Sequence, residues 1–243
     1  MLLPKRADNA IRRFLERRGY AFVRGEDASA LARRSRLLQS QQIDLVIDVG
    51  ANSGQYGRRL RELGYTGRIH SFEPMQSAWR ELEHACGGDG NWTATRAALG
   101  DASGTIALHV SENSISSSLL ELLPQHERNA PASRYVADES VPMCRLDDLF
   151  DDIRRGARNV WLKLDVQGFE DKVLVGAESS LTSISMIQME LSLTPLYSEQ
   201  KTYLPLCQYL HDRRFELVGV EAGFQERATG VLLQVDGIFR RQA

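Results

Sequence analysis

Short apolar runs separated by loops containing Gly or Pro dominate the chain from residue 43 onward, and they predict buried strands. The first run, Ile-Asp-Leu-Val-Ile-Asp-Val over residues 43–49, is mainly apolar, as is typical of a parallel strand buried on both faces. Similar runs predict further strands over residues 68–72, 92–99, 105–110, 160–166, 186–191, 215–220 and 231–240.

Segments with helical character alternate with these strands. Helices are expected over about residues 54–63, 76–86 and 202–213, and one begins near Phe169. Strands that alternate with helices predict an α/β protein with an open, mostly parallel Rossmann-like sheet and helices on both faces. The last two strands have no helix between them, so the final strand is expected to be antiparallel. Residues 112–142, rich in Ser, Pro and Asn, are expected to form an irregular loop or lid.

The first 41 residues differ from the rest because they carry ten Lys/Arg and only four acidic residues. Apolar residues at helical spacing predict two short amphipathic helices here, the first ending at Gly19. We therefore expect a basic helical N-terminal extension over 1–41 and one domain over 42–243. The basic residues are interpreted either as solvated helix faces or as a surface for an anionic substrate or a membrane headgroup.

Composition excludes several classes of protein. The net charge of −2 gives no support to a nucleic-acid partner driven by overall charge. No stretch approaches the roughly 20 apolar residues of a membrane span, and the N-terminus lacks the apolar segment of a secretory signal. Three widely spaced cysteines form neither a disulfide framework nor a CxxC site, and no metal site is expected. These features predict a cytoplasmic protein.

The most informative pattern is a glycine-rich loop between the first strand and the next helix. Glycines there permit a tight turn and let a ligand approach the backbone. Glu73, at the end of the second strand, is placed to bind both hydroxyls of a ribose. The loop residues expected to contact the cofactor are Asp48, Gly50, Ala51, Asn52 and Gly54.

Two cofactors fit such a loop, NAD(P) and S-adenosylmethionine (SAM). Asp48 would repel a pyrophosphate but would favour the ammonium group of SAM, directly or through water. The loop also reads G-x-x-x-G rather than the dinucleotide pattern G-x-G-x-x-G. Both facts favour SAM, although a role for Asp48 in binding loop amides is an alternative.

Charged residues at the ends of the two following central strands are the candidates for catalysis. Lys163 and Asp165 share one face of the strand over 160–166, and Glu190 ends the strand over 186–191. Asp165 is the first candidate for a general base and Glu190 the second. The alternatives are a structural Lys163–Asp165 ion pair, a hydrogen-bonding role for Glu190, and a Mg²⁺ site formed by both carboxylates with Glu170.

A Ser-rich segment supplies candidates for substrate binding. The amide of Asn113 and the hydroxyl of Ser117 are able to bond SAM or a sugar, and a simple Ser-rich turn is the alternative.

The order and spacing of several motifs resemble the FkbM family of SAM-dependent methyltransferases. The resemblance runs from about Ile43 to Arg240 and rests on VIDVGANSGQYG, SFEP, AALGD, NSISSSLL, WLKLDVQGFE, MELSLTPLY and QVDGIFR. It implies a class I methyltransferase fold, an adenine site bordered by Ala98 and Leu99, and O-methylation of a sugar, glycolipid or secondary-metabolite hydroxyl.

The expected partner is accordingly a small-molecule acceptor, either glycosylated or lipid-linked, with peripheral membrane contact left open. Two other functions stay possible at this point. One is an N- or protein methyltransferase on the same fold, and the other is a SAM-binding regulator without turnover. NAD-dependent oxidoreduction is disfavoured because no convincing catalytic Tyr/Lys or His pair is present.

Overall fold

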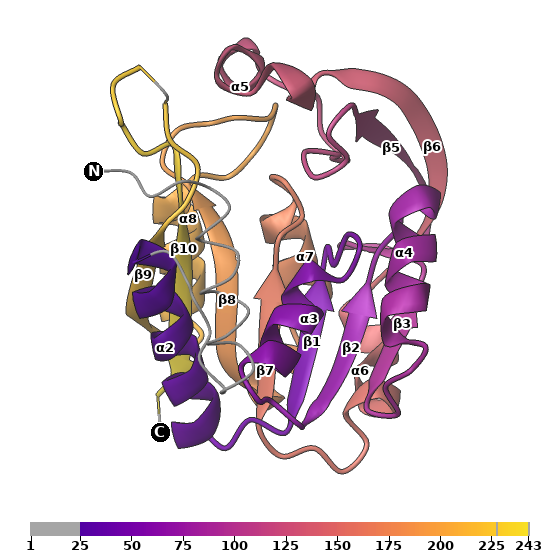
Figure 1. Cartoon of the computed structure of the whole chain (residues 1–243), viewed down its shortest axis with the longest axis vertical. Coiled ribbons are helices and arrows are strands. Elements are labelled where there is room, and N and C mark those ends of the chain that lie inside the picture. Colours follow the sequence, from indigo (N-terminus) through magenta and orange to yellow (C-terminus); the bar gives the residue numbers. More distant parts are fainter. Residues whose placement is uncertain (1–24, 227, 243) are drawn as a thin grey trace, which may run out of the picture.

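The computed structural model describes residues 25–226 and 228–242, and its central feature is a seven-stranded sheet (Figure 1). The strand order is β3-β2-β1-β7-β8-β10-β9. β10 alone runs opposite to the other six strands, which confirms the mostly parallel sheet with an antiparallel last strand. The strands are β1 (Leu45–Val49), β2 (Arg68–Phe72), β3 (Trp92–Thr95), β7 (Val160–Leu164), β8 (Ile184–Ser192), β9 (Phe215–Ala222) and β10 (Gln234–Arg241).

Helices cover both faces of this sheet, as the alternating pattern predicts (Figure 1). All five residues of β1 are buried; Leu45, Ile47 and Val49 pack on one face, and Val46 packs on the other. The first face is covered by α6 (Leu146–Arg154), α7 (Glu170–Gly176) and α8 (Tyr203–His211), and the second by α2 (Gly25–Ser40), α3 (Gln55–Glu62) and α4 (Gln76–Cys86). Two apolar cores on one sheet explain why β1 and β7, which are buried at every position, lack polar alternation.

The N-terminal extension takes part in this packing. The second expected helix is α2, whose Leu31 and Leu38 are buried. The first expected helix and Gly19 lie outside the described residues. The division of the chain into an extension over 1–41 and a domain over 42–243 stays a prediction. In the structure, α2 packs on the same sheet as the elements that follow it.

A second, three-stranded sheet corrects two expectations. The single strand expected over 92–99 is wrong, because the chain turns after Thr95 and β4 (Ala98–Leu99) pairs elsewhere. The expectation that 112–142 is irregular throughout is also wrong, because β6 (Tyr135–Cys144) pairs with both β4 and β5 (Gly104–Ser111). Only one residue of β6 is buried and half are exposed to solvent, so the apolar alternation that marks a strand is missing from its sequence.

The rest of that segment folds over the carboxyl ends of the central strands (Figure 1). It contains the short helix α5 (Pro124–Asn129) and the 3₁₀ turn η1 (Pro131–Ser133). A second 3₁₀ turn, η2 (Ser180–Ser183), precedes β8. Within the described ranges, no helix is long and apolar enough to cross a membrane.

Candidate functional site

A cavity of about 610 Å³ opens where β1, β7 and β8 end and antiparallel β10 begins. This volume is typical of a small-molecule site, and carboxyl ends of strands are where open α/β sheets bind ligands. Most of the residues expected from sequence to contact cofactor or substrate lie on the cavity wall, and so do all three expected catalytic residues. These wall residues are Gly50, Ala51, Asn52, Glu73, Ala98, Leu99, Asn113 and Ser117, with Lys163, Asp165 and Glu190.

The glycine-rich loop passes very close to the end of β7. Gly50 has a φ of 75°, and a Cβ placed on it would lie 1.9 Å from the backbone oxygen of Asp165. Gly50, Ala51 and Asn52 line the cavity, whereas Gly54 does not. Gly54 instead precedes α3 with a φ of 83°, and a Cβ there would lie 3.2 Å from the ring of Trp92. The absence of a side chain at Gly54 therefore lets the start of α3 pack close to Trp92, and Gly54 does not line the cavity.

Replacement of Gly50 by Ala is expected to lower the free energy of unfolding by about 2–3 kcal/mol, since it adds backbone strain to an overlap with the main chain. Gly64→Ala is the matched control, because Gly64 has a φ of 82° and a Cβ placed on it would have no neighbour within 4 Å. The control should lose only about 1–2 kcal/mol, the cost of the left-handed backbone alone. Urea denaturation of both variants measures the difference, and equal losses would contradict the close approach at Gly50.

Glu73 lies at the end of β2 and is only 6% exposed. Its Oε2 accepts a hydrogen bond of 2.7 Å from the Asn52 amide, and its Oε1 accepts one of 2.8 Å from the Met75 amide. Burial raises the pKa of this carboxyl to about 7, although the two amides oppose the shift. The two bonds hold the carboxylate against the glycine-rich loop with lone pairs left for a ligand.

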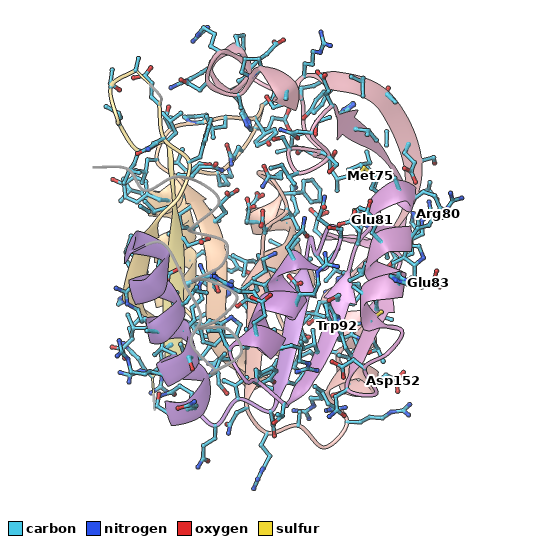
Figure 2. The ribbon with its side chains drawn as sticks, in the orientation of Figure 1. Met75, Arg80, Glu81, Glu83, Trp92 and Asp152 are labelled. Atoms are coloured by element: carbon cyan, nitrogen blue, oxygen red, sulfur yellow. The ribbon has the colours of Figure 1, made fainter. Side chains whose placement is uncertain are left out.

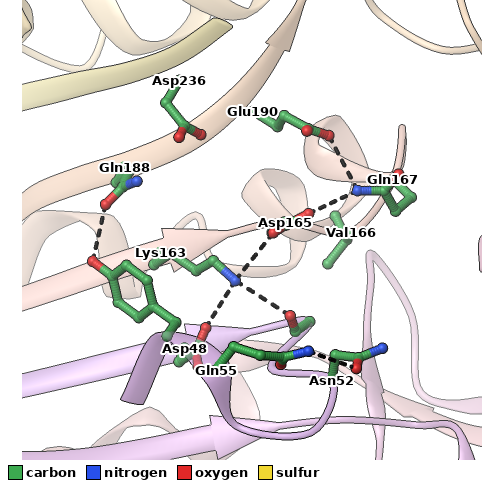
Figure 3. Close-up of polar contacts among 12 residues, drawn as sticks. Asp48, Asn52, Gln55, Lys163, Asp165, Val166, Gln167, Gln188, Glu190 and Asp236 are labelled. Carbon is green, nitrogen blue, oxygen red and sulfur yellow. Dashed lines mark hydrogen bonds and ion pairs between the residues drawn. The ribbon is translucent and has the colours of Figure 1, made fainter. Parts of the chain in front are cut away.

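Asp48 does not line the cavity, although its charge suggested a position near the ammonium group of SAM. It is fully buried and is absent from the cavity wall, and its Oδ1 lies 2.9 Å from Lys163 Nζ on the neighbouring strand. The same ammonium lies 3.4 Å from Asp165 Oδ2 and donates to the Gly50 carbonyl at 3.2 Å (Figure 3). Because Lys163 balances its charge, Asp48 acts on the cavity through Lys163, and direct contact with a cofactor stays a prediction.

Glu190 is held beside these residues by two amide side chains. Its Oε2 accepts a hydrogen bond from Gln167 Nε2 at 3.2 Å (Figure 3). It also accepts one from Gln234 Nε2 at 2.8 Å. Burial raises the pKa of Glu190 well above its ordinary value, and the nearby carboxylate of Asp165 adds to the shift. Gln167 also donates to Asp165 Oδ1 at 2.7 Å, so one amide joins the two candidate bases.

The remaining expected residues come from the second sheet and from the turn that follows β5. Ala98 and Leu99 form β4 and line the cavity. The Ser117 hydroxyl accepts a hydrogen bond from the Ser111 amide at 3.0 Å, while Asn113 Oδ1 accepts from the Ser116 amide. Both side chains therefore order the Ser-rich turn at the cavity wall, and a contact with substrate stays a prediction.

The alternative Mg²⁺ site finds no support in the described part of the chain, where no group of three or more His, Cys, Asp or Glu residues is arranged to hold a metal ion. Glu170 is 2% exposed and is absent from the cavity wall. Its Oε1 accepts from the amides of Val166 and Gly168, so it organises the loop after β7.

Several cavity residues were not anticipated. They come from segments distant in sequence and include Arg34 of α2, Tyr56 of α3, His126 of α5, Gln188 of β8, and Gln234 and Asp236 of β10. Asp236 carries the same signal as Glu190, a lone carboxylate within an apolar strand, and that signal was available in the sequence. Arg34 belongs to the basic N-terminal segment, for which a surface for an anionic substrate was one interpretation, whereas His126 carries no signal, since only folding brings it to the cavity.

Comparison with known proteins agrees with this geometry. The sequence model described as Methyltransferase FkbM domain matches residues 48–217. The 2-O-methyltransferase NoeI of Sinorhizobium fredii (strain NBRC 101917 / NGR234) is 28% identical over 170 residues, which cover 67% of this chain and 68% of that protein.

Solved structures with a similar arrangement include an rRNA methylase from Streptococcus thermophilus and a precorrin-6y C5,15-methyltransferase from Geobacter metallireducens. The first is 11% identical with a TM-score of 0.48 and covers 92% of this chain and 100% of that chain. The second is 14% identical with a TM-score of 0.45 and covers 88% and 89%, respectively.

The family match begins at Asp48 in β1 and extends through β7 and β8, so it contains the glycine-rich loop, Glu73, Lys163, Asp165 and Glu190. These are the segments that build most of the cavity. With well over half of its length matched, the chain belongs to the FkbM methyltransferase domain family and has the expected Rossmann-like methyltransferase fold.

Proposed function

We propose that this methyltransferase uses SAM to methylate a hydroxyl group of a sugar, glycolipid or secondary metabolite. The observation that carries the proposal is a buried carboxylate, Glu190, on the same cavity as the glycine-rich loop and Glu73. The 2-O-methyltransferase NoeI, a relative at 28% identity, supports an oxygen acceptor.

The residues on the cavity wall fit SAM. The Glu73 carboxylate is fixed by two amides and suits the two ribose hydroxyls, and the apolar Ala98 and Leu99 suit the adenine. Gly50 has no side chain, so the loop can approach the end of β7 closely and a ligand can approach the loop backbone. Asp165 is 44% exposed, which leaves part of its carboxylate available to the cationic end of the ligand.

In this proposal, SAM supplies a methyl group already activated by a sulfonium, so the chain has to align the acceptor and exclude water. The Ser-rich turn and α5 cover the cavity from above the sheet, which serves the exclusion of water (Figure 1). An alcohol also benefits from loss of its proton, and Glu190 is the better placed of the two candidate bases, because a carboxylate with a raised pKa is the stronger proton acceptor. Asp165 shares its charge with Lys163 and is proposed to orient the ligand.

Transfer of radiolabelled methyl groups from SAM to a panel of sugars and lipid-linked saccharides tests the proposal. Label in a base-stable methyl ether supports O-methylation. Label in an amine or a protein instead would support the other enzyme class. Tight SAM binding with no transfer to any acceptor would contradict an enzymatic role and favour a regulator.

Binding of SAM is expected to depend on pH through Glu73. Hydrogen bonds from ribose hydroxyls favour the ionised carboxylate, so bound SAM should lower a pKa that stands at about 7 in the free protein. Affinity should therefore be full above pH 7 and fall as the pH drops below it, by up to about tenfold per unit.

Calorimetry on wild type and Glu73→Gln separates this effect from other titrations. The variant should bind SAM about tenfold or more weakly above neutral pH, since a charged hydrogen bond is worth about 1.5–3 kcal/mol, and its affinity should no longer fall on acidification. Glu83→Gln is the matched control, because Glu83 is exposed on the outer surface of α4 (Figure 2). A folded Glu73→Gln protein with unchanged affinity would remove Glu73 from the cofactor site.

A further inference from the structure

Three carboxylates form one row across neighbouring strands at the end of the cavity beside β10; Glu190 and Asp236 line the cavity, and Glu221 is buried next to Asp236 without lining it. Asp236 pairs in register with Glu190 on β8 and with Glu221 on β9, so the three side chains lie on one face of the sheet. Phe224 and Gln234 complete this part of the wall, and the backbone amide of Gln234 donates to the Phe224 carbonyl at 3.0 Å. We call these five residues, with Arg34, the β10 end.

Every Lys or Arg on the described cavity wall is already engaged by carboxylates. Arg34 donates to Glu221 and lies 3.2 Å from Asp236, and Lys163 is shared by Asp48 and Asp165. The third such cation, Arg59, lies 2.7 Å from Glu62 on the surface of α3.

Around the β10 end, carboxylates therefore outnumber cations. The five carboxylates are Asp48, Asp165, Glu190, Glu221 and Asp236, and the three cations are Lys163, Arg34 and Arg33. Glu190 has amide partners but no ion-pair partner within the described ranges. A ligand anion in this space would have to break an existing ion pair or stay uncompensated, and both are costly.

His126 provides a second, independent indication that a polar ligand binds here. Its side chain is 4% exposed and lies on the cavity wall, and Nδ1 has no hydrogen-bond partner in the described structure. The ring lies near two aromatic side chains, 5.1 Å from Tyr197 and 5.4 Å from Phe224 between centroids. Nδ1 itself is fully buried, so a ligand hydroxyl in the cavity would bond it only after the ring turns; that bond would satisfy a buried polar atom whose lack of a partner is uncommon.

We propose that the β10 end and His126 bind the ring that carries the acceptor hydroxyl, and that they select rings bearing hydroxyl or ammonium groups over rings bearing a carboxylate or phosphate. Glu190 and Asp236 accept hydrogen bonds from such donors, and charge-assisted bonds of this kind are strong. Phe224 offers an aromatic surface to the apolar side of a ring. The inference rests on the proposed function and adds to it the charge of the acceptor.

The selectivity has a structural origin distinct from the cofactor site. Arg34, Phe224, Gln234 and Asp236 all lie outside residues 48–217, the part of the chain that matches the family. Cofactor contacts thus come from the family-matched region, and much of the acceptor wall comes from the segments that flank it.

Saturation-transfer NMR with three methyl glycosides tests the proposal on the full chain saturated with S-adenosylhomocysteine. The probes are a neutral glucoside, a cationic glucosaminide and an anionic glucuronide, mixed in equal amounts at pH 7, which lies above the pKa of about 6 to which burial raises the Asp236 carboxyl. Binding of the first two should exceed that of the glucuronide by about tenfold or more, because placing like charges together costs several kcal/mol.

Two variants connect the selectivity to these residues. Asp236→Asn should remove any preference for the glucosaminide over the glucoside, while the exposed Asp152→Asn of α6 should leave it unchanged (Figure 2). His126→Phe keeps an aromatic ring near Tyr197 and Phe224 but lacks Nδ1. Its affinity for the glucoside should therefore fall about tenfold, while its SAM affinity and melting temperature should stay unchanged.

Glucuronide binding equal to glucoside binding, or no binding of the glucoside and glucosaminide, would overturn the proposal. Calorimetry with SAM on the same preparation separates this failure from a failure of the proposed function. If SAM binds but the probes do not bind in the expected order, only the acceptor selectivity is contradicted. If SAM does not bind, the proposed function itself is contradicted.

Discussion

Replacement of Glu190 by Gln is expected to lower kcat for methylation of a hydroxyl acceptor by about 10²–10⁴-fold, the usual contribution of a general base. The variant keeps the size and much of the hydrogen bonding of the side chain but cannot take up a proton. Both amide bonds to Glu190 go to Oε2, so Oε1 has no partner in the described structure and is available to the acceptor.

Rates at saturating SAM and acceptor, measured beside SAM affinity on the same protein, isolate this effect. Glu83→Gln serves again as the carboxylate-to-amide control, and its kcat should equal that of wild type. Affinity for SAM should change little in Glu190→Gln. A normal kcat in this variant would remove Glu190 from the catalytic residues.

The comparison with Asp165→Asn distinguishes the two candidate bases. Asp165 already contacts Lys163 and Gln167, which is the arrangement of an orienting group. Its loss should weaken SAM binding more than it lowers kcat at saturation. The reverse result, normal SAM affinity with a roughly 10²-fold or larger fall in kcat, would make Asp165 the base. If both variants turn over normally, alignment alone accounts for catalysis.

Replacement of Lys163 by Met is expected to cost about 3–5 kcal/mol in free energy of unfolding, because it leaves Asp48 charged, fully buried and unpaired. Burial already raises the pKa of Asp48, and Lys163 is the group that opposes this shift. The Met side chain fills a volume similar to that of the Lys stem, so the loss measures the charge rather than packing.

A double-mutant cycle identifies the cause of the loss. Adding Asp48→Asn to Lys163→Met removes the unpaired charge and should recover most of the lost stability, while the two single losses should not add. Chemical denaturation of the four proteins gives the coupling energy. A Lys163→Met protein that loses less than about 1 kcal/mol would show that the pair contributes little.

The central strands of the main sheet could be predicted from sequence because β1 and β7 are buried at every position, and β8 at most positions, so that each reads as an apolar run. β6 could not, because its pairing with β5 depends on backbone hydrogen bonds while only one of its side chains is buried. The break between β3 and β4 was hidden for a related reason, since Trp92–Leu99 reads as one run and only the turn at Ala97 divides it. α6 had no counterpart among the expected elements, although Leu146, Phe150 and Ile153 follow helical spacing.

The cavity wall around the glycine-rich loop was largely predictable, since Gly50–Asn52 and Glu73 follow directly from strand ends. The partner of Asp48 was not, because the register that places it opposite Lys163 joins strands more than 100 residues apart. The same limit applies to the β10 end. Arg34 and Asp236 lie near opposite ends of the chain and meet only because α2 packs on the sheet beside β10.

A crystal structure of the full chain with S-adenosylhomocysteine tests the central claim most directly. The account predicts the ribose hydroxyls at Glu73, the adenine beside Ala98 and Leu99, and the sulfur directed toward the space between Asp165 and Glu190. Density for the ligand in another place, or a ribose that makes no contact with Glu73, would contradict it.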